Sequence, residues 1–142
     1  MKTLNLHLAL SVRFSETDAM GVVWHGNYLK FFEDAREAFG KKYGIEYLSI
    51  HSHGFFVPIV KSEIEHKASV FYGDEIEILI ELVFLKAAKI KFNYKIYNKK
   101  SKTIVATGST TQVFLASKNR ELMLNKPAFY SAWELEQEWI EN

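Results

Sequence analysis

The residues from position 17 to 28, TDAMGVVWHGNY, combine the groups that an acyl-transfer reaction needs. Asp18 supplies a carboxylate and His25 an imidazole, while Gly26 lets a ligand approach the backbone closely. The free N–H groups at the start of a helix attract negative charge. A carboxylate that faces a carbonyl polarised by such N–H groups is a hydrolytic arrangement. The same residue types are common in turns, so a purely structural turn is an equal alternative for this stretch alone.

Two periodic segments flank this stretch and would have to position it. Apolar residues at every second position from Leu4 to Phe14 predict a strand with one buried face, ending near Phe14. From Asn27 onward apolar residues recur every three or four positions, which predicts an amphipathic helix. Asn27 is the expected N-cap of this helix and Gly44 its stop. The candidate site therefore lies in a connection between two regular elements, where functional residues are common.

The remainder of the chain predicts four more strands and a short helix. We expect the strands at about residues 56–69, 75–84, 89–96 and 103–116. Pro58 indicates an edge or a bulge near the start of the first, and YGDE forms a turn before the second. Acids of the second strand would face lysines of the third across an antiparallel pair. Pro127 would open a terminal helix through Trp133 and Trp139. This order indicates an α+β fold with the long helix on an antiparallel sheet.

Composition limits the class of protein. The chain has 142 residues, 48% of them hydrophobic, which fits one domain over 1–142 that buries more surface by pairing with a copy of itself. It contains no cysteine, which excludes disulfides and thiolate chemistry and permits a reducing compartment. Asn5 and His7 interrupt the first apolar run, so we read it as mature protein rather than as a signal peptide. No run approaches the ~18 apolar residues of a membrane span, and we expect a cytoplasmic protein that does not contact a membrane.

The stretch VRFSETDAMGVVWHGNYLKFFEDAR, residues 12–36, resembles the signature of the 4-hydroxybenzoyl-CoA thioesterase family. These are hot-dog-fold acyl-CoA thioesterases, and the likeness is to the branch with histidine ahead of the asparagine. It extends over essentially the whole chain, including the turn at Gly73 and Asp74 and the final strand ATGSTTQVF. The resemblance implies a five-stranded antiparallel sheet wrapped around one long helix, with a short C-terminal helix. It also implies a homodimer joined edge to edge with two sites at the interface, and often a tetramer.

The resemblance assigns roles to the residues of the opening stretch. Asp18 matches the catalytic carboxylate, as nucleophile or as base for water. His25 matches the position whose backbone N–H, with or without its side chain, polarises the thioester carbonyl. Gly26, Asn27 and Tyr28 match the end of the motif, which holds the turn and contacts the substrate. Glu33, which lies on the helix, is interpreted as a solvated or structural charge. The sequence ASVFYGD departs from the proline that the family often carries there, which indicates an altered turn or pocket lining.

Further residues are candidates for substrate binding. Aromatic rings such as Phe32 and Phe56 would line the acyl slot. Residues 86–120 contain nine of the 18 basic residues and no acid. Three of these lysines, Lys86, Lys89 and Lys91, would contact the phosphates of coenzyme A, although a solvated strand face is the commoner meaning of such a pattern.

Other ligands are not indicated. The strand aromatics follow the period of the core, which disfavours a nucleic-acid interface. The histidines of HSH, residues 51–53, have no cysteine or acid nearby and make a poor metal site.

The sequence therefore predicts a thioester hydrolase that converts an acyl-CoA into a free acid and coenzyme A. No metal or redox cofactor is expected, and coenzyme A enters only as part of the substrate. Three alternatives remain open at this level: a thioesterase for acyl groups on acyl carrier protein, a non-catalytic acyl-CoA-binding module, and a hot-dog dehydratase. The acyl group itself is not specified, because one fold hosts many substrates.

Overall fold

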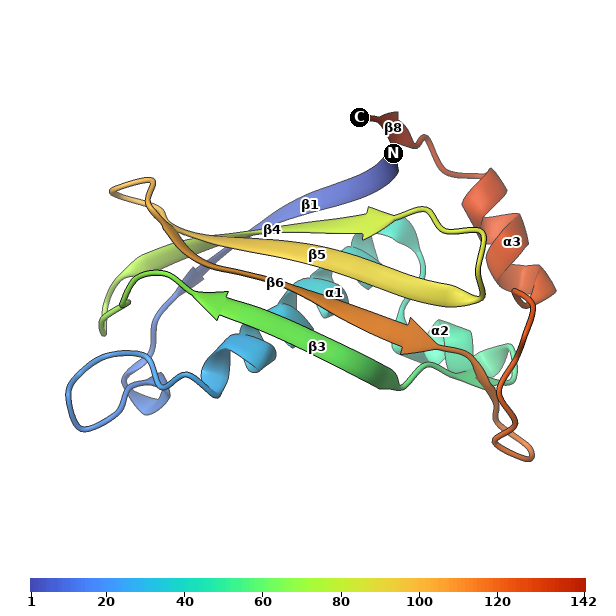
Figure 1. Cartoon of the computed structure of the whole chain (residues 1–142), viewed down its shortest axis with the longest axis horizontal. Helices are drawn as coiled ribbons and strands as arrows, with labels where there is room; N and C mark the ends of the chain where they lie inside the picture. Colours follow the sequence, from blue (N-terminus) through green and yellow to red (C-terminus); the bar gives the residue numbers. More distant parts are fainter.

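The computed structural model describes all residues, 1–142, and places one long helix, α1, across one face of an antiparallel sheet (Figure 1). The sheet has the order β3-β6-β5-β4-β1-β8. Its strands are β1 (Lys2–Ser11), β3 (Ile59–His66), β4 (Glu75–Val83), β5 (Lys89–Asn98), β6 (Ile104–Val113) and the short β8 (Ile140–Glu141). A separate pair consists of β2 (Phe55–Phe56) and β7 (Leu115–Ala116). The helices are α1 (Asn27–Tyr43), α2 (Tyr47–Ser52) and α3 (Ala128–Leu135).

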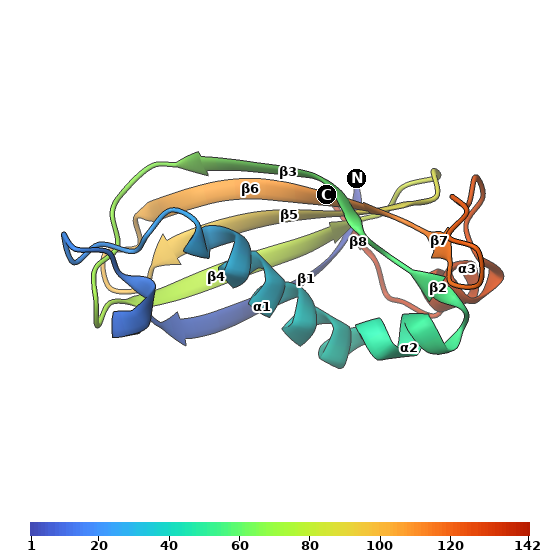
Figure 2. The ribbon, with the colours of Figure 1, turned by 90° about the horizontal axis from the view of Figure 1, so that it is seen from below.

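The core lies between α1 and the inner face of the sheet (Figure 2). The alternation along β4 and β5 buries one side of each strand, and the side chains of Ile78, Ile80 and Ile96 have no exposed surface. From the helix, Phe32 and Phe39 are equally buried against this layer. Gly44 ends α1 with a left-handed φ of 71°, a conformation that glycine adopts without strain. The predicted α+β arrangement and the predicted helix stop are both confirmed.

The start of the site region differs from the sequence prediction. β1 ends at Ser11 rather than near Phe14, because residues Phe14–Glu16 form a 3-10 turn. The Glu16 carboxylate accepts a hydrogen bond of 2.7 Å from the backbone N–H of Arg13 and closes this turn. Phe14 is consequently 75% exposed instead of belonging to a buried strand face. Asn27 is the first residue of α1, and Gly26 rather than Asn27 occupies the N-cap position.

Other helix and strand boundaries, and one strand pairing, also differ from the sequence prediction. α2 and β8 are present although the sequence did not predict them, and α3 ends at Leu135 instead of continuing to Trp139 as predicted. The expected facing of acids and lysines between β4 and β5 is found only at Glu75, which forms an ion pair of 3.7 Å with Lys99 just after β5. Elsewhere the register places Glu81 opposite Asn93 and Lys95 opposite Leu79. The register shift after Ile59 and the edge position of β3 confirm the interpretation of Pro58.

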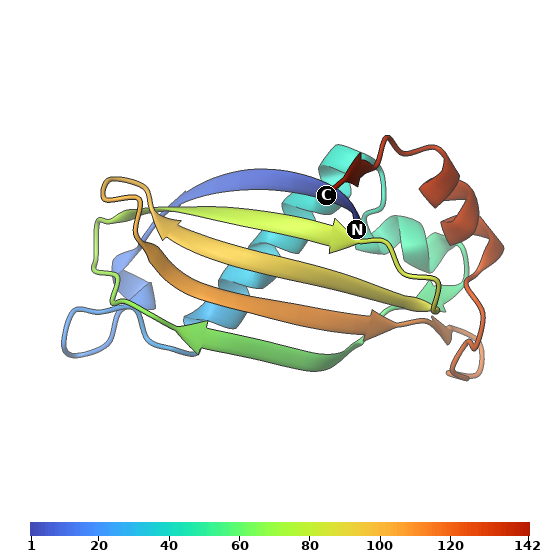
Figure 3. The ribbon, with the colours of Figure 1, turned by 45° about the horizontal axis from the view of Figure 1, so that its top comes forward.

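The direction of β3 determines how the two ends of the molecule relate. β3 begins beside α2 and runs to the end where the residues between β1 and α1 lie (Figures 1 and 2). It has β6 as its only partner, so its other edge is open, and seven of its eight residues are exposed. Figure 3 shows α1 crossing behind the sheet between these two ends. None of the helices combines the length and hydropathy that crossing a membrane requires.

Candidate functional site

The loop that carries Asp18 is closed by its own backbone. The N–H of Asp18 donates to the carbonyl of Val22 at 2.8 Å, and the N–H of Gly21 donates to the carbonyl of Asp18 at 3.0 Å. Gly21 has a φ of 79°, which this tight turn requires and which most side chains disfavour. The Asp18 side chain is therefore presented from a short, hydrogen-bonded turn.

The carboxylate of Asp18 is half-buried and only partly engaged. One oxygen, Oδ1, accepts a hydrogen bond of 2.8 Å from the backbone N–H of Met20. No hydrogen bond or ion pair within the chain reaches the other oxygen, Oδ2. A carboxylate fixed through one oxygen and free at the other can accept a proton from water or attack a carbonyl carbon.

Glu16 ties this loop to the start of α1. Its backbone carbonyl accepts hydrogen bonds from the N–H of Trp24 at 3.0 Å and from the side chain of Asn27 at 2.8 Å. Its buried carboxylate accepts from Arg13 and, at 3.2 Å, from Lys30. Burial raises the pKa of Glu16, but the hydrogen bonds and charges of Arg13 and Lys30 outweigh burial and hold that pKa below its usual value. Sequence reasoning missed Glu16, although it lies two residues before Asp18.

The backbone at the entrance of α1 offers free donors. The N–H groups of Asn27 and Tyr28 donate to the carbonyls of Trp24 and His25. In contrast, the N–H groups of His25 and Gly26 make no backbone hydrogen bond. The N–H groups of His25 and Gly26 are thus the donors available for an oxyanion. The sequence had suggested that all N–H groups of the first helical turn would be free. A Cβ atom on Gly26 would collide with the Trp24 ring, so a larger residue here would displace that exposed ring from the entrance of α1.

Two histidines and a tyrosine meet beside these donors. The ring of His66, at the end of β3, lies with its centroid 4.8 Å from that of Tyr28 and 6.5 Å from that of His25. Tyr28 is 4% exposed, and burial raises the pKa of its hydroxyl. The sequence does not indicate that His66 lies here, because nothing in it shows that β3 returns to this loop. No group of three or more histidine, acidic or cysteine side chains is arranged to hold a metal ion.

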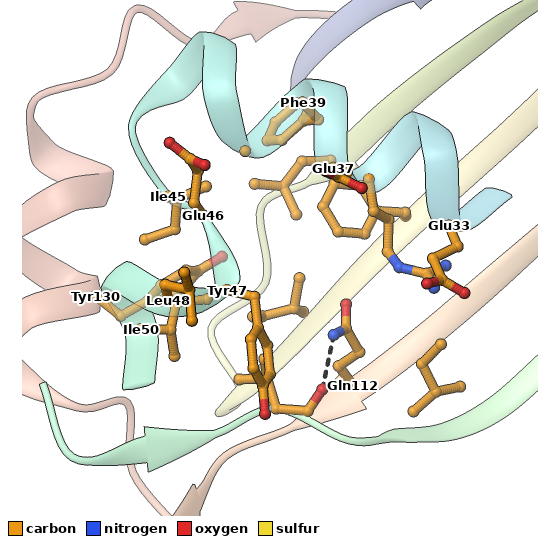
Figure 4. Close-up of a pocket in the computed structure, with 17 residues that line it drawn as sticks. Glu33, Glu37, Phe39, Ile45, Glu46, Tyr47, Leu48, Ile50, Gln112 and Tyr130 are labelled. Carbon is orange, nitrogen blue, oxygen red and sulfur yellow. Dashed lines mark hydrogen bonds between the residues drawn. The ribbon is translucent and has the colours of Figure 1, made fainter. Parts of the chain in front are cut away.

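A cavity of about 480 Å³ opens at the end of the molecule opposite the Asp18 loop, between α1, α2 and the first residues of β3 (Figure 4). Its interior is apolar and aromatic, with Phe92 and Tyr130 among the lining residues. Polar groups lie along α1, where Glu33 and Arg36 line the cavity, and on β6, where Gln112 does. Figure 4 places Glu33 at one end of the lining and Tyr130 at the other. Glu33 is exposed, as expected of a solvated charge, but it also borders this space.

Arg36 brings a largely unpaired cation to the cavity. Its guanidinium donates to the hydroxyl of Tyr94 at 2.9 Å, and no carboxylate oxygen forms an ion pair with it. The Tyr94 hydroxyl is in turn 2.6 Å from that of Thr110, and both residues are 1% exposed. Burial raises the pKa of Tyr94, so its hydroxyl stays protonated at neutral pH. Most donors of Arg36 therefore remain available to a ligand oxygen.

The remaining candidates lie elsewhere in the single chain. Phe32 is fully buried and stacks on Tyr94 with ring centroids 4.0 Å apart, so its ring belongs to the core rather than to the wall of an open slot. Phe56 is half-buried in β2, next to the cavity but outside its lining. Three lysines, Lys86, Lys89 and Lys91, lie in or after the β4–β5 connection, at the α2 end and away from Asp18 (Figure 1). One chain thus separates the catalytic candidates from the cavity and the lysines.

Comparison with known proteins gives consistent results. The model of the thioesterase-like superfamily matches residues 12–133. A 1,4-dihydroxy-2-naphthoyl-CoA hydrolase from Synechococcus elongatus is 31% identical over 112 residues, which cover 78% of this chain and 81% of that protein. A candidate acyl-CoA thioesterase from Bacillus subtilis is 34% identical over 63% of this chain and 64% of its own length. The solved DHNA-CoA thioesterase from Staphylococcus aureus superposes with a TM-score of 0.81 at 25% identity, covering 92% of this chain and 89% of that one.

Proposed function

Because the chain belongs to the thioesterase-like superfamily, we propose that it hydrolyses an acyl-CoA thioester to a free carboxylic acid and coenzyme A. The observation that carries this proposal is the half-free carboxylate of Asp18 on the same loop as the unpaired N–H groups of His25 and Gly26. This arrangement supplies a group that activates or replaces water and a group that stabilises an oxyanion.

The reaction follows from these groups. The thioester oxygen accepts hydrogen bonds from the N–H groups of His25 and Gly26, which stabilise the negative charge as it develops. Asp18 either takes a proton from the attacking water or attacks the carbonyl carbon itself, and both routes use the free Oδ2. Asn27 acts indirectly, since its side chain fixes the backbone of Glu16 and hence the position of the loop. Tyr28 forms a buried wall beside the reacting groups.

A homodimer would unite the parts that one chain keeps apart. The open edge of β3 exposes Ile59 and Val60 by 41% and 59%, and an unprotected strand edge favours pairing with a second strand. A twofold axis through the middle of β3 sets its first residue against the last residue of the partner's β3. Ile59, which lines the cavity, then lies opposite His66 of the partner. Each active site would contain the cavity of one chain and the loop of the other.

The cavity and the comparisons support an aromatic acyl group. A volume of about 480 Å³ falls within the usual range for small-molecule sites, and rings from α1, β5 and α3 line it. Relatives named for a dihydroxynaphthoyl-CoA substrate favour a bicyclic acyl group. Glu33 of this chain would face the substituents of that ring. In the same dimer, Lys86 and Lys89 lie at the cavity end, where they could contact the phosphates of coenzyme A.

The proposal is tested by measuring thiol release from a panel of aromatic and aliphatic acyl-CoAs. We expect turnover of at least one aromatic acyl-CoA and a loss of two or more orders of magnitude in kcat for Asp18→Asn. Asp34→Asn is the matched control, because Asp34 is a half-buried carboxylate on α1 without a hydrogen bond or ion pair and lines neither part of the proposed site. Turnover of no acyl-CoA, or equal activity of both variants, would contradict the proposal.

A further inference from the structure

His66 differs from the other residues near the site because it belongs neither to the Asp18 loop nor to α1. It is exposed at the end of β3, and its ring stands almost perpendicular to those of Tyr28 and His25, at 80° and 83°. Its ring nitrogens make no hydrogen bond or ion pair within the chain. The rings of His7 and His53, in contrast, are engaged by Glu77 and by the carbonyl of Ser49. His66 is therefore an imidazole held in place by aromatic contact, with both nitrogens free.

The backbone after β3 explains why this imidazole is near the site. The N–H of Val23 in the Asp18 loop donates to the carbonyl of Val70 at 2.7 Å, and Val22 pairs with Phe71. These contacts bind the segment that follows His66 to the loop that carries Asp18. Because Tyr28 is 4% exposed and fixed in the first turn of α1, the ring against which His66 packs is itself immobilised.

Thioester hydrolysis creates charge at three places, and only two of them are served by groups already described. Asp18 serves the water or the carbonyl carbon, and the N–H groups of His25 and Gly26 serve the carbonyl oxygen. The third charge develops on sulfur as the carbon–sulfur bond breaks. An imidazole titrates near neutral pH, so it can carry a proton to such an atom. His66 is a titratable side chain outside the Asp18 loop and α1 that contacts this group of residues.

We propose that His66 is a further catalytic residue, which protonates the sulfur of the leaving coenzyme A. The inference rests on the proposed function. Water adds to the carbonyl carbon while Asp18 accepts one of its protons. The tetrahedral intermediate then collapses, the carbon–sulfur bond breaks, and the proton of the His66 imidazolium passes to sulfur. Asp18 returns its proton to the imidazole through solvent, so that thioester and water become acid and thiol.

The test separates proton donation from packing by changing the leaving group. His66→Phe keeps an aromatic ring against Tyr28 but has no proton to donate. Two thioesters of one aryl acid are compared, the coenzyme A ester and the 4-nitrothiophenyl ester, whose thiol is acidic enough to leave unprotonated. For each ester the kcat/KM of the variant is divided by that of the wild type. His66→Gln provides a second variant, and His7→Phe, on the outer face of β1, is the matched control.

We expect both His66 variants to lose about 100-fold or more on the coenzyme A ester and less than about fivefold on the nitrothiophenyl ester. His7→Phe should stay near wild type on both. Equal losses on the two esters would show a structural role and overturn the proposal, and so would full activity of both variants. If the wild type hydrolyses neither ester, the proposed function itself fails. These outcomes are distinguishable, because only the last involves the unmodified protein.

Discussion

The hydroxyl of Tyr94 joins Arg36 at the cavity to Thr110 in the core, and replacing these groups should reveal an energetic coupling. In Tyr94→Phe the ring stacking on Phe32 is kept, but the 1% exposed Thr110 hydroxyl loses its partner. An unsatisfied buried hydroxyl costs about 1–3 kcal/mol. In Thr110→Val the Tyr94 hydroxyl still contacts Arg36, so we expect a cost of only about 1 kcal/mol.

The double variant should be less destabilised than the sum of the single variants. With both hydroxyls absent, only the half-buried Arg36 lacks a partner, and it can turn to solvent in the cavity. We therefore expect a coupling free energy of about 1 kcal/mol or more. Urea unfolding of the four proteins measures it, with Tyr97→Phe on the outer face as a control that should change the stability little. Single-variant costs that add within about 0.5 kcal/mol would refute this account of the buried network.

Three further predictions follow from the same structure. Gly108→Ala should lower the free energy of unfolding in urea by about 1–3 kcal/mol, since the added Cβ would collide with the carbonyl oxygen of Glu63 and lie 2.7 Å from the Phe32 ring; unchanged stability would contradict this packing. Glu16→Gln should destabilise most at neutral pH, because the pKa of Glu16 is lowered in the folded state. Its ionised form therefore stabilises the fold above the ordinary value of 4.5, and this advantage disappears as the pH falls through the lowered pKa; a stability difference that does not shrink as the pH is lowered from 7 through the acid range would exclude this origin. Arg36→Met should reduce kcat/KM for hydroxynaphthoyl-CoA about tenfold or more relative to naphthoyl-CoA, through loss of a charged hydrogen bond, and an unchanged ratio would show that Arg36 does not contact the acyl group.

The long elements of the fold could be predicted because their signals are local. Alternation along β4 and β5 and the three-to-four spacing along α1 describe side chains that face one common core. The six residues of α2 were missed because they make less than two helical turns, which is too short for a three-to-four spacing of apolar residues to repeat. The two residues of β8 form a strand only because they pair with Lys2 and Thr3. Facing charges were misjudged because the register, which the hairpin connection sets, is not visible in either strand.

The candidate site was partly visible in the sequence for the same reason. Asp18 and His25 lie within one short motif, so their proximity is local. His66 lies 41 residues beyond His25, and its place beside that ring depends on the whole path of β3. The cavity combines residues of α1, α2, β3, β4, β5, β6 and α3, so no single stretch of the sequence indicates it. We expected Phe32 to line an acyl slot, but its ring stacks on Tyr94 in the core. The sequence shows only that both residues face the core, not that their rings meet.

The central claim is that Asp18 of one chain acts on an acyl group held in the cavity of its partner. The claim is tested by forming mixed dimers from two variants, each of which disables a different half of the site. Asp18→Asn removes the carboxylate, and Ile59→Trp places an indole at the cavity lining, where the native side chain is 41% exposed. Each variant should be inactive alone. In a mixed dimer both defects fall in one site, and the other site is intact.

Thiol release is therefore measured after the two variants are unfolded together in equal amounts and refolded. Random pairing makes half of the dimers mixed, so the account predicts recovery of about a quarter of the wild-type activity. Each variant refolded alone provides the baseline. If the mixture stays at that baseline while native mass spectrometry, which resolves the three dimers by mass, shows that mixed dimers have formed, each site lies within one chain and the central claim is wrong.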